Sequence, residues 1–70
     1  MEYTVVLHKA EEGGYWAEVP ALEGCFSQGE TVEECLNSVK EAVESHILAL
    51  QEDGRQVPAD DIMILSRVAV

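Results

Sequence analysis

The apolar positions of the chain follow a helical spacing in one stretch and an alternating spacing elsewhere. Between residues 32 and 53 they recur every three or four residues, as on one face of an α-helix. Thr31 and Glu34 have the form of a capping box, in which the hydroxyl accepts from the amide of residue 34 and the carboxylate returns to the cap residue's own amide. Gly54 supplies a stop signal. The pattern therefore predicts one amphipathic helix, with an apolar stripe of Val32, Cys35, Leu36, Val39, Val43, Ile47 and Leu50.

Four shorter stretches are typical of β-strands. Residues 3–8, 15–19 and 25–28 are rich in apolar, aromatic and β-branched side chains and are separated by glycine, proline and acidic turn residues. The longest candidate is 62–70, whose two alternating faces are both mostly apolar, as in a strand that is buried on both sides. The predicted order is β-β-β-α-β.

This order indicates an α+β fold of two layers, a mostly antiparallel sheet with one helix on one face. Counting strand directions makes the last strand parallel to the first if the two are neighbours, with a right-handed crossover through the helix. One helix can cover only one face of the sheet, yet the strands carry apolar side chains on both. We therefore expect a second copy or another protein to cover the other face. The alternative is an outer face that is merely more apolar than average.

The length allows one domain, which we expect to span residues 1–70. A domain of this size removes only about 60% of its unfolded surface from water and often needs a disulfide, a metal or self-association. Cys25 and Cys35 do not form a CxxC pair, and we expect both to be reduced structural thiols. No apolar leader and no run of about 20 apolar residues is present, which favours a cytoplasmic protein without a membrane span.

The chain is strongly acidic, with a formal net charge of -10 and only four lysine and arginine residues. Nucleic acid binding depends on clustered basic side chains, so direct contact with nucleic acid is not expected. An acidic surface attracts basic partners, although it can also serve solubility alone. The four cations are Lys9, Lys40, Arg55 and Arg67.

The polar residues do not form a recognisable catalytic or ligand-binding motif. No serine lies in a GxSxG elbow, and no phosphate loop or dinucleotide fingerprint is present. His46 shares the apolar helix face, and His8 ends a strand without HxH or HExxH spacing. Glu41 and Glu44 lie on the solvent side of the predicted helix. We therefore expect no catalytic, cofactor or metal site, and a protein that is not an enzyme.

The stretch from Gly14 to Glu34, GYWAEVPALEGCFSQGETVEE, closely resembles the signature of the HicB-like antitoxin family. The likeness continues to Asp53-Gly54 and Val57-Pro58 and so covers almost the whole chain. It implies a partial ribonuclease H-like fold with the final strand beside and parallel to the first. The first strand lacks the carboxylate of an active nuclease, which fits a scaffold without nuclease activity.

Members of this family neutralise HicA, a small basic toxin that cleaves messenger RNA, and they form dimers or tetramers. The resemblance therefore implies an antitoxin-type binding module with a homo-oligomeric state and a HicA-like partner. Full-length members add a DNA-binding segment after this domain. The sequence shows none before Val70, so no DNA-binding domain is expected here. The alternative is a stand-alone oligomeric domain without a toxin partner, which could bind a small ligand.

Four residues are candidates for partner or subunit contacts: Tyr15, Trp16, Met63 and Leu65. Tyr15 and Trp16 are adjacent on a predicted strand and must face opposite ways, so one of them can point outward. The alternative is that both serve core and dimer packing. Met63 and Leu65 share one face of the last predicted strand.

Overall fold

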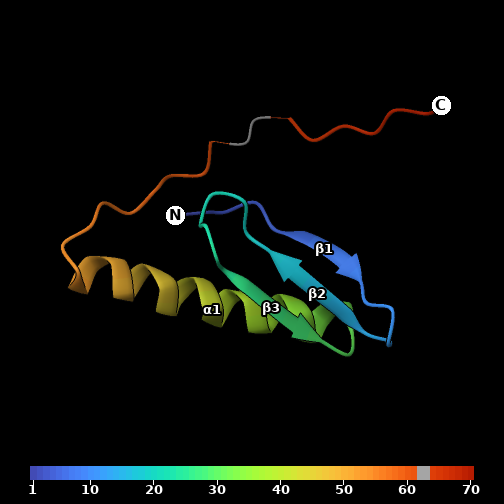
Figure 1. Cartoon of the computed structure of the whole chain (residues 1–70), viewed down its shortest axis with the longest axis horizontal. Coiled ribbons are helices and arrows are strands. Elements are labelled where there is room, and N and C mark those ends of the chain that lie inside the picture. The colour runs from blue at the N-terminus through green and yellow to red at the C-terminus, as the bar shows by residue number, and fades with distance from the viewer. Residues whose placement is uncertain (62–63) are drawn as a thin grey trace.

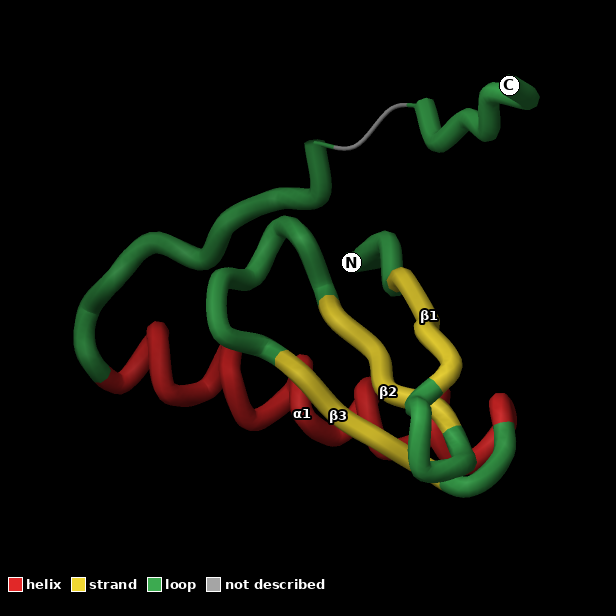
Figure 2. Tube along the Cα trace, turned by 45° about the vertical axis from the view of Figure 1, so that its right-hand side comes forward, coloured by secondary structure: helices red, strands yellow, loops and turns green. Residues whose placement is uncertain are grey.

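The computed structural model, which describes residues 1–61 and 64–70, has two layers (Figure 1). One layer is a sheet of three strands, β1 (Val6–Lys9), β2 (Tyr15–Glu18) and β3 (Phe26–Gly29). The other is the helix α1 (Val32–Glu52), which lies across one face of the sheet (Figure 2). The structure confirms the predicted α+β class and the predicted order of the first four elements along the chain. The first strand begins at Val6 and not at Tyr3 as expected.

The sheet is antiparallel throughout, with the strand order β1-β2-β3. In the β1–β2 hairpin His8 lies opposite Trp16, and in the β2–β3 pair Trp16 lies opposite Gln28. The hairpin turn closes through a hydrogen bond from the amide of Ala10 to the carbonyl of Gly14. Gly14 adopts a φ of 76°, a conformation that favours glycine because it lacks a Cβ. The chain therefore turns between Ala10 and Gly14, where the alternating apolar pattern of the strands is interrupted.

Both ends of α1 form at the predicted residues. The hydroxyl of Thr31 accepts from the amide of Glu34 at 3.1 Å. The carboxylate of Glu34 accepts from the amide of Glu30, one residue before the cap, at 3.1 Å, so the expected return to the amide of Thr31 itself is wrong. At the other end Asp53 caps the helix and Gly54 has a φ of 69°. The first turn is thus fixed by both halves of a modified capping box.

The core lies between the helix and β2 and includes a loop that the pattern did not identify as buried. Leu22, in the connection from β2 to β3, is only 1% exposed. Its amide donates to the carbonyl of Val19, and its carbonyl accepts from the amide of Cys25, so the loop folds back on itself. The buried residues are Ala17, Val19, Leu22, Cys25, Cys35 and Val39. Both cysteines are free thiols within this core, as the sequence predicted.

The backbone of β3 comes very close to the start of the helix at Gly29. A Cβ at this position would lie 2.5 Å from the amide nitrogen of Cys35 and 2.9 Å from its Cα. Real Cβ atoms do not approach backbone atoms this closely, so only glycine fits. The close approach allows α1 to pack mainly against β3 and then β2.

The predicted fourth strand is not formed by residues 64–70, which have no regular secondary structure and are exposed. They lead away from the sheet and the helix (Figures 1 and 2). Residues 62 and 63, which complete the predicted strand and include Met63, lie outside the described residues. A strand that is apolar on both faces needs a layer on each side, and the one helix lies mainly over β2 and β3. The pairing of a last strand with β1 is therefore not confirmed.

Candidate functional site

The face of the sheet opposite the helix carries six side chains in two rows. Val6, Glu18 and Phe26 form one row of cross-strand neighbours, and His8, Trp16 and Gln28 form the other. Successive strand residues point to opposite faces. Leu7, Tyr15 and Ala17 pack in or against the core, so their neighbours in the sequence point away from it. We call these six residues the outer face.

Three rings lie in contact across the outer face. The imidazole of His8 stacks on the indole of Trp16, and Phe26 lies on the other side of Trp16 with ring centroids 6.2 Å apart and a tilt of 49°. Phe26 is 60% exposed. Clustered aromatic rings with this exposure are typical of the anchors of protein interfaces.

The outer face carries one carboxylate, that of Glu18, beside the rings. Nε2 of His8 lies 2.7 Å from Oε2 of Glu18, and the two side chains are 39% and 34% exposed. This contact orients the imidazole on the indole. His8 thus has an acid and an aromatic ring as neighbours, and no three metal-ligating side chains come together among residues 1–61 and 64–70.

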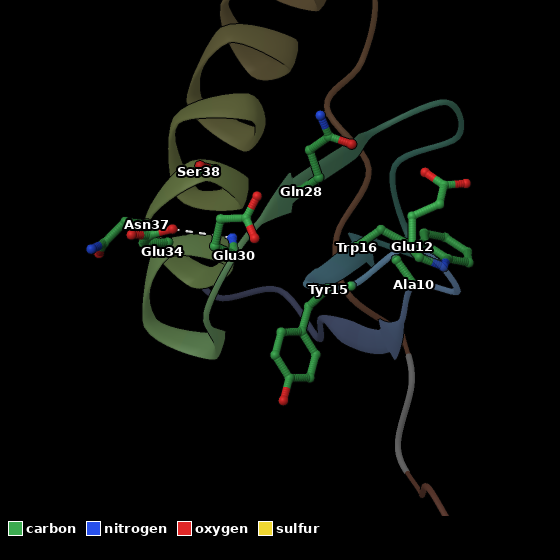
Figure 3. Close-up of a pocket in the computed structure, with 11 residues that line it drawn as sticks. Ala10, Glu12, Tyr15, Trp16, Gln28, Glu30, Glu34, Asn37 and Ser38 are labelled. Atoms are coloured by element: carbon green, nitrogen blue, oxygen red, sulfur yellow. Dashed lines mark hydrogen bonds between the residues drawn. The ribbon is translucent and has the colours of Figure 1, made fainter.

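Trp16 and Gln28 also line an open hollow of about 810 Å³ beside the hairpin and the start of the helix (Figure 3). Three carboxylates line the same hollow: Glu12 from the hairpin, and Glu30 and Glu34 from the helix entry. Figure 3 shows Tyr15 and Trp16 pointing in different directions from adjacent positions of β2. The acidic hollow and the aromatic outer face therefore share one boundary, formed by Trp16 and Gln28.

The structure separates the four predicted contact residues. Trp16 is on the outer face, and Tyr15 is half-buried against the core on the helix side. Leu65 is 67% exposed, and Met63 lies outside the described residues. His8 and Phe26 were not among the predicted contacts. The alternation that places Trp16 outward, applied to the neighbouring strands, is the signal that could have found both.

The two cysteine thiols are poorly placed for chemistry because both are buried. Burial raises the pKa of the Cys25 thiol above its ordinary value of 9.0, so the thiolate is disfavoured at neutral pH. Cys35 is fully buried. The outer face therefore offers recognition by three rings and by the carboxylate of Glu18.

The helix that the described residues form does not have the length and apolar character needed to cross a membrane.

Comparison with known proteins gives consistent matches over most of the chain. Residues 3–67 match the family model described as HicB_like antitoxin of bacterial toxin-antitoxin system. UPF0150 protein Ta0767 of Thermoplasma acidophilum is 44% identical over 87% of this chain and 88% of its own length. UPF0150 protein ssr1765 of Synechocystis is 44% identical over 89% of this chain and 78% of its own. An uncharacterized 14.9 kDa protein of Haemophilus phage HP1 is 38% identical over 83% of this chain and 43% of its own.

Proposed function

The chain belongs to the HicB-like antitoxin family, and from this premise we propose that it is a binding module that self-associates and neutralises a small basic HicA-like toxin. The module acts by occlusion and is not an enzyme. The toxin would cleave messenger RNA when free, so the complex would act in the cytoplasm. The outer face supports this proposal most directly, because it combines three exposed or half-exposed rings with a carboxylate on an acidic chain.

The charge of the chain favours encounter with a basic partner. Complementary charges raise association rates and add less to the final affinity. A net charge of -10 and the carboxylates Glu12, Glu30 and Glu34 beside Trp16 supply the attraction. The association rate should therefore fall as salt is added, because mobile ions screen charges over about 10 Å at 0.1 M.

The aromatic residues of the outer face would set the lifetime of the complex. Trp and other large rings dominate many interfaces because they bury a large area with few rotatable bonds. We propose Trp16, Phe26 and His8 as the anchors for the partner. Tyr15 supports the same strand from the core side.

Self-association is the second part of the proposal. One domain spanning residues 1–70 forms a dimer or tetramer, in which the C-terminal segment with Met63 and Leu65 lies at a subunit contact. The family likeness also supports a fourth strand beside and parallel to β1, as in a partial ribonuclease H-like fold. Covering the C-terminal segment would remove several exposed apolar side chains from water.

The test is a binding titration between this chain and the product of an adjacent short reading frame that encodes a small basic protein. We expect a complex at low salt that abolishes RNA cleavage by that protein. Phe26→Ser should weaken the complex by about tenfold or more, as truncation of a central anchor does. Leu48→Ser is the matched control, because Leu48 is 56% exposed on the helix and Phe26 is 60% exposed on the sheet.

The absence of a complex at low salt would contradict the toxin-binding proposal. It would favour the alternative of a stand-alone oligomeric domain, for which the open hollow beside Trp16 is the site to test with small ligands. If Phe26→Ser and Leu48→Ser weakened the complex equally, the outer face would not be the binding surface. The proposal that the chain binds a basic toxin would still stand.

A further inference from the structure

The strand β3 has a free edge on the side away from β2, because among the described residues it pairs only with β2. The amide of Val19 donates to the carbonyl of Cys25 at 3.2 Å, and these two residues continue the register of the β2–β3 pair. In an antiparallel pair, opposed residues that exchange hydrogen bonds alternate with opposed residues that do not. Counted from Cys25, every second residue of β3 therefore bonds to β2.

This alternation fixes which main-chain groups the free edge presents. Ser27 and Gly29 bond to β2, so the amides and carbonyls of Phe26 and Gln28 point away from it. In the described part of the chain, no turn, cap or side chain forms a hydrogen bond with these four groups. The free edge therefore offers two donors and two acceptors to another strand.

The free edge of β3 lacks the usual devices that prevent strand addition. Natural edges carry lysine, proline or a bulge, or they are covered by another segment. The β3 sequence, FSQG, contains neither lysine nor proline, and its register with β2 has no bulge. At the opposite edge of the sheet, the chain's own residue Asp60 accepts from the amide and hydroxyl of Thr4, just before β1. The edge of β3 is thus the one open to another molecule.

Two hollows border the free edge of β3. A hollow of about 400 Å³ is lined by Trp16, Phe26, Ser27 and Gln28, and it offers room for an apolar side chain against the rings. The acidic hollow described above begins at Gln28 and continues to the start of the helix. Figure 3 shows Glu30 and Glu34 there, joined by the hydrogen bond from the amide of Glu30 to the carboxylate of Glu34.

The charges beside the edge favour a basic segment over a second copy of this chain. Glu12, Glu30 and Glu34 line the acidic hollow, and neither hollow is lined by a lysine or arginine of the described residues. A second copy would bring the same carboxylates and a further net charge of -10. Like charges on neighbouring strands are destabilising, and opposite charges stabilise the pair.

We propose that an extended basic segment of the partner adds to β3 as a further strand of the sheet. This inference rests on the proposed function, the binding of a small basic protein, and names the main-chain contact that makes it. The segment bonds to the main chain of Phe26 and Gln28 and places an apolar side chain in the hollow beside Phe26. A lysine or arginine four residues away then lies beside Glu30, about 13 Å along the strand at roughly 3.3 Å per residue. Strand addition of this kind takes affinity from the main chain and specificity from alternate side chains.

Amide hydrogen exchange of the wild-type chain tests the main-chain contact directly. In the free chain, the amides of Phe26 and Gln28 should exchange rapidly, and the amide of Ser27 should be protected by its bond to β2. The probe is the small basic protein encoded by the adjacent reading frame, added at low salt. We expect exchange at Phe26 and Gln28 to slow by about tenfold or more in the complex, because both amides become hydrogen-bonded.

A matched pair of variants tests the same contact through affinity. Gln28→Pro removes the amide donor at the free edge, a position where strands tolerate proline. Gln28→Ala removes the same side chain and keeps the donor. We expect Gln28→Pro to weaken the complex by about tenfold or more relative to Gln28→Ala, with the helical circular dichroism signal unchanged. If Gln28→Pro does not fold, the exchange measurement on the wild-type chain decides.

The outcomes separate this inference from the proposed function. A complex without slowed exchange at Phe26 and Gln28, or equal binding by Gln28→Pro and Gln28→Ala, would overturn strand addition and leave the binding of a basic partner standing. The absence of any complex would overturn both. Protection of Phe26 and Gln28 that appears in the free chain as its concentration is raised would assign the edge to a second copy, and would overturn the assignment to a basic partner.

Discussion

The imidazole of His8 stacks on the indole of Trp16 with ring centroids 4.1 Å apart and an angle of 16° between the planes. The two residues are directly opposite each other in the β1–β2 pair, so the stack is a cross-strand contact on the outer face. It restricts the rotation of both rings before any partner arrives. A restricted ring loses less conformational entropy on binding, which makes Trp16 a better anchor than a freely rotating indole.

Glu18→Gln should weaken the binding of a basic partner and change the stability of the fold only slightly. The carboxylate contacts His8 at the surface, and exposed pairs of this kind contribute about 0.2 to 1 kcal/mol, so the free energy of unfolding should change by less than about 1 kcal/mol. Urea denaturation measures this change. Binding of a basic partner at low salt should weaken more than it does in the control Glu41→Gln, whose carboxylate is on the exposed side of the helix. Equal effects of the two variants on binding would rule out a special role for Glu18.

Gly29→Ala should destabilise the fold strongly. The added Cβ would meet the backbone of Cys35 at 2.5 Å, so β3 and the helix would have to move apart. Overpacking of this kind typically costs about 1 to 3 kcal/mol and sometimes more. Thermal or urea unfolding of the variant measures the loss.

The control for this change is Gly54→Ala. Gly54 has a positive φ but open space where its Cβ would be, so only conformational strain, about 1 kcal/mol, is expected there. A Gly29→Ala variant as stable as Gly54→Ala would mean that the helix can shift away from β3 at little cost.

The buried thiol of Cys25 predicts a loss of stability at alkaline pH. Its pKa is raised above 9.0 by burial, so the folded protein holds this proton more tightly than the unfolded chain does. As the pH rises past about 9 the unfolded chain releases the proton first, and the free energy of unfolding falls until the folded thiol also ionises. Below that pH the contribution is fully present.

Cys25→Ala should remove this dependence. The difference in unfolding free energy between wild type and variant is expected to be constant from pH 6 to 8 and to shrink above pH 9, with other titrating groups cancelling in the comparison. A constant difference across the whole range would show that the Cys25 thiol ionises equally in both states.

The sequence predicted those elements whose signals are local. Thr31, Glu34 and Gly54 define both ends of the helix through contacts within a few residues. The structure has these contacts, except that the Glu34 carboxylate accepts from the amide of Glu30 and not from that of Thr31. The glycines of the first hairpin and the alternation of β2 likewise act over short distances. Helix caps and tight turns are encoded by neighbours in the chain, which explains the agreement.

Other features depend on contacts that no local pattern encodes. Leu22 lies in a stretch that reads as a turn, yet three backbone hydrogen bonds fold the loop so that its side chain enters the core. The apolar pattern at residues 62–70 predicts a strand, but a strand needs an edge and a cover, which the pattern does not supply. The outer face was expected to be apolar, and its rings are instead interleaved with His8, Glu18 and Gln28.

The link between Thr4 and Asp60 joins positions 56 residues apart in the chain, yet it consists of hydrogen bonds from one residue to one carboxylate. Breaking it would free the last part of the chain without opening the contact of Gly29 with the helix or disturbing Leu22. Such a local opening requires far less free energy than global unfolding. The last part of the chain should therefore detach and return many times for each unfolding of the whole domain.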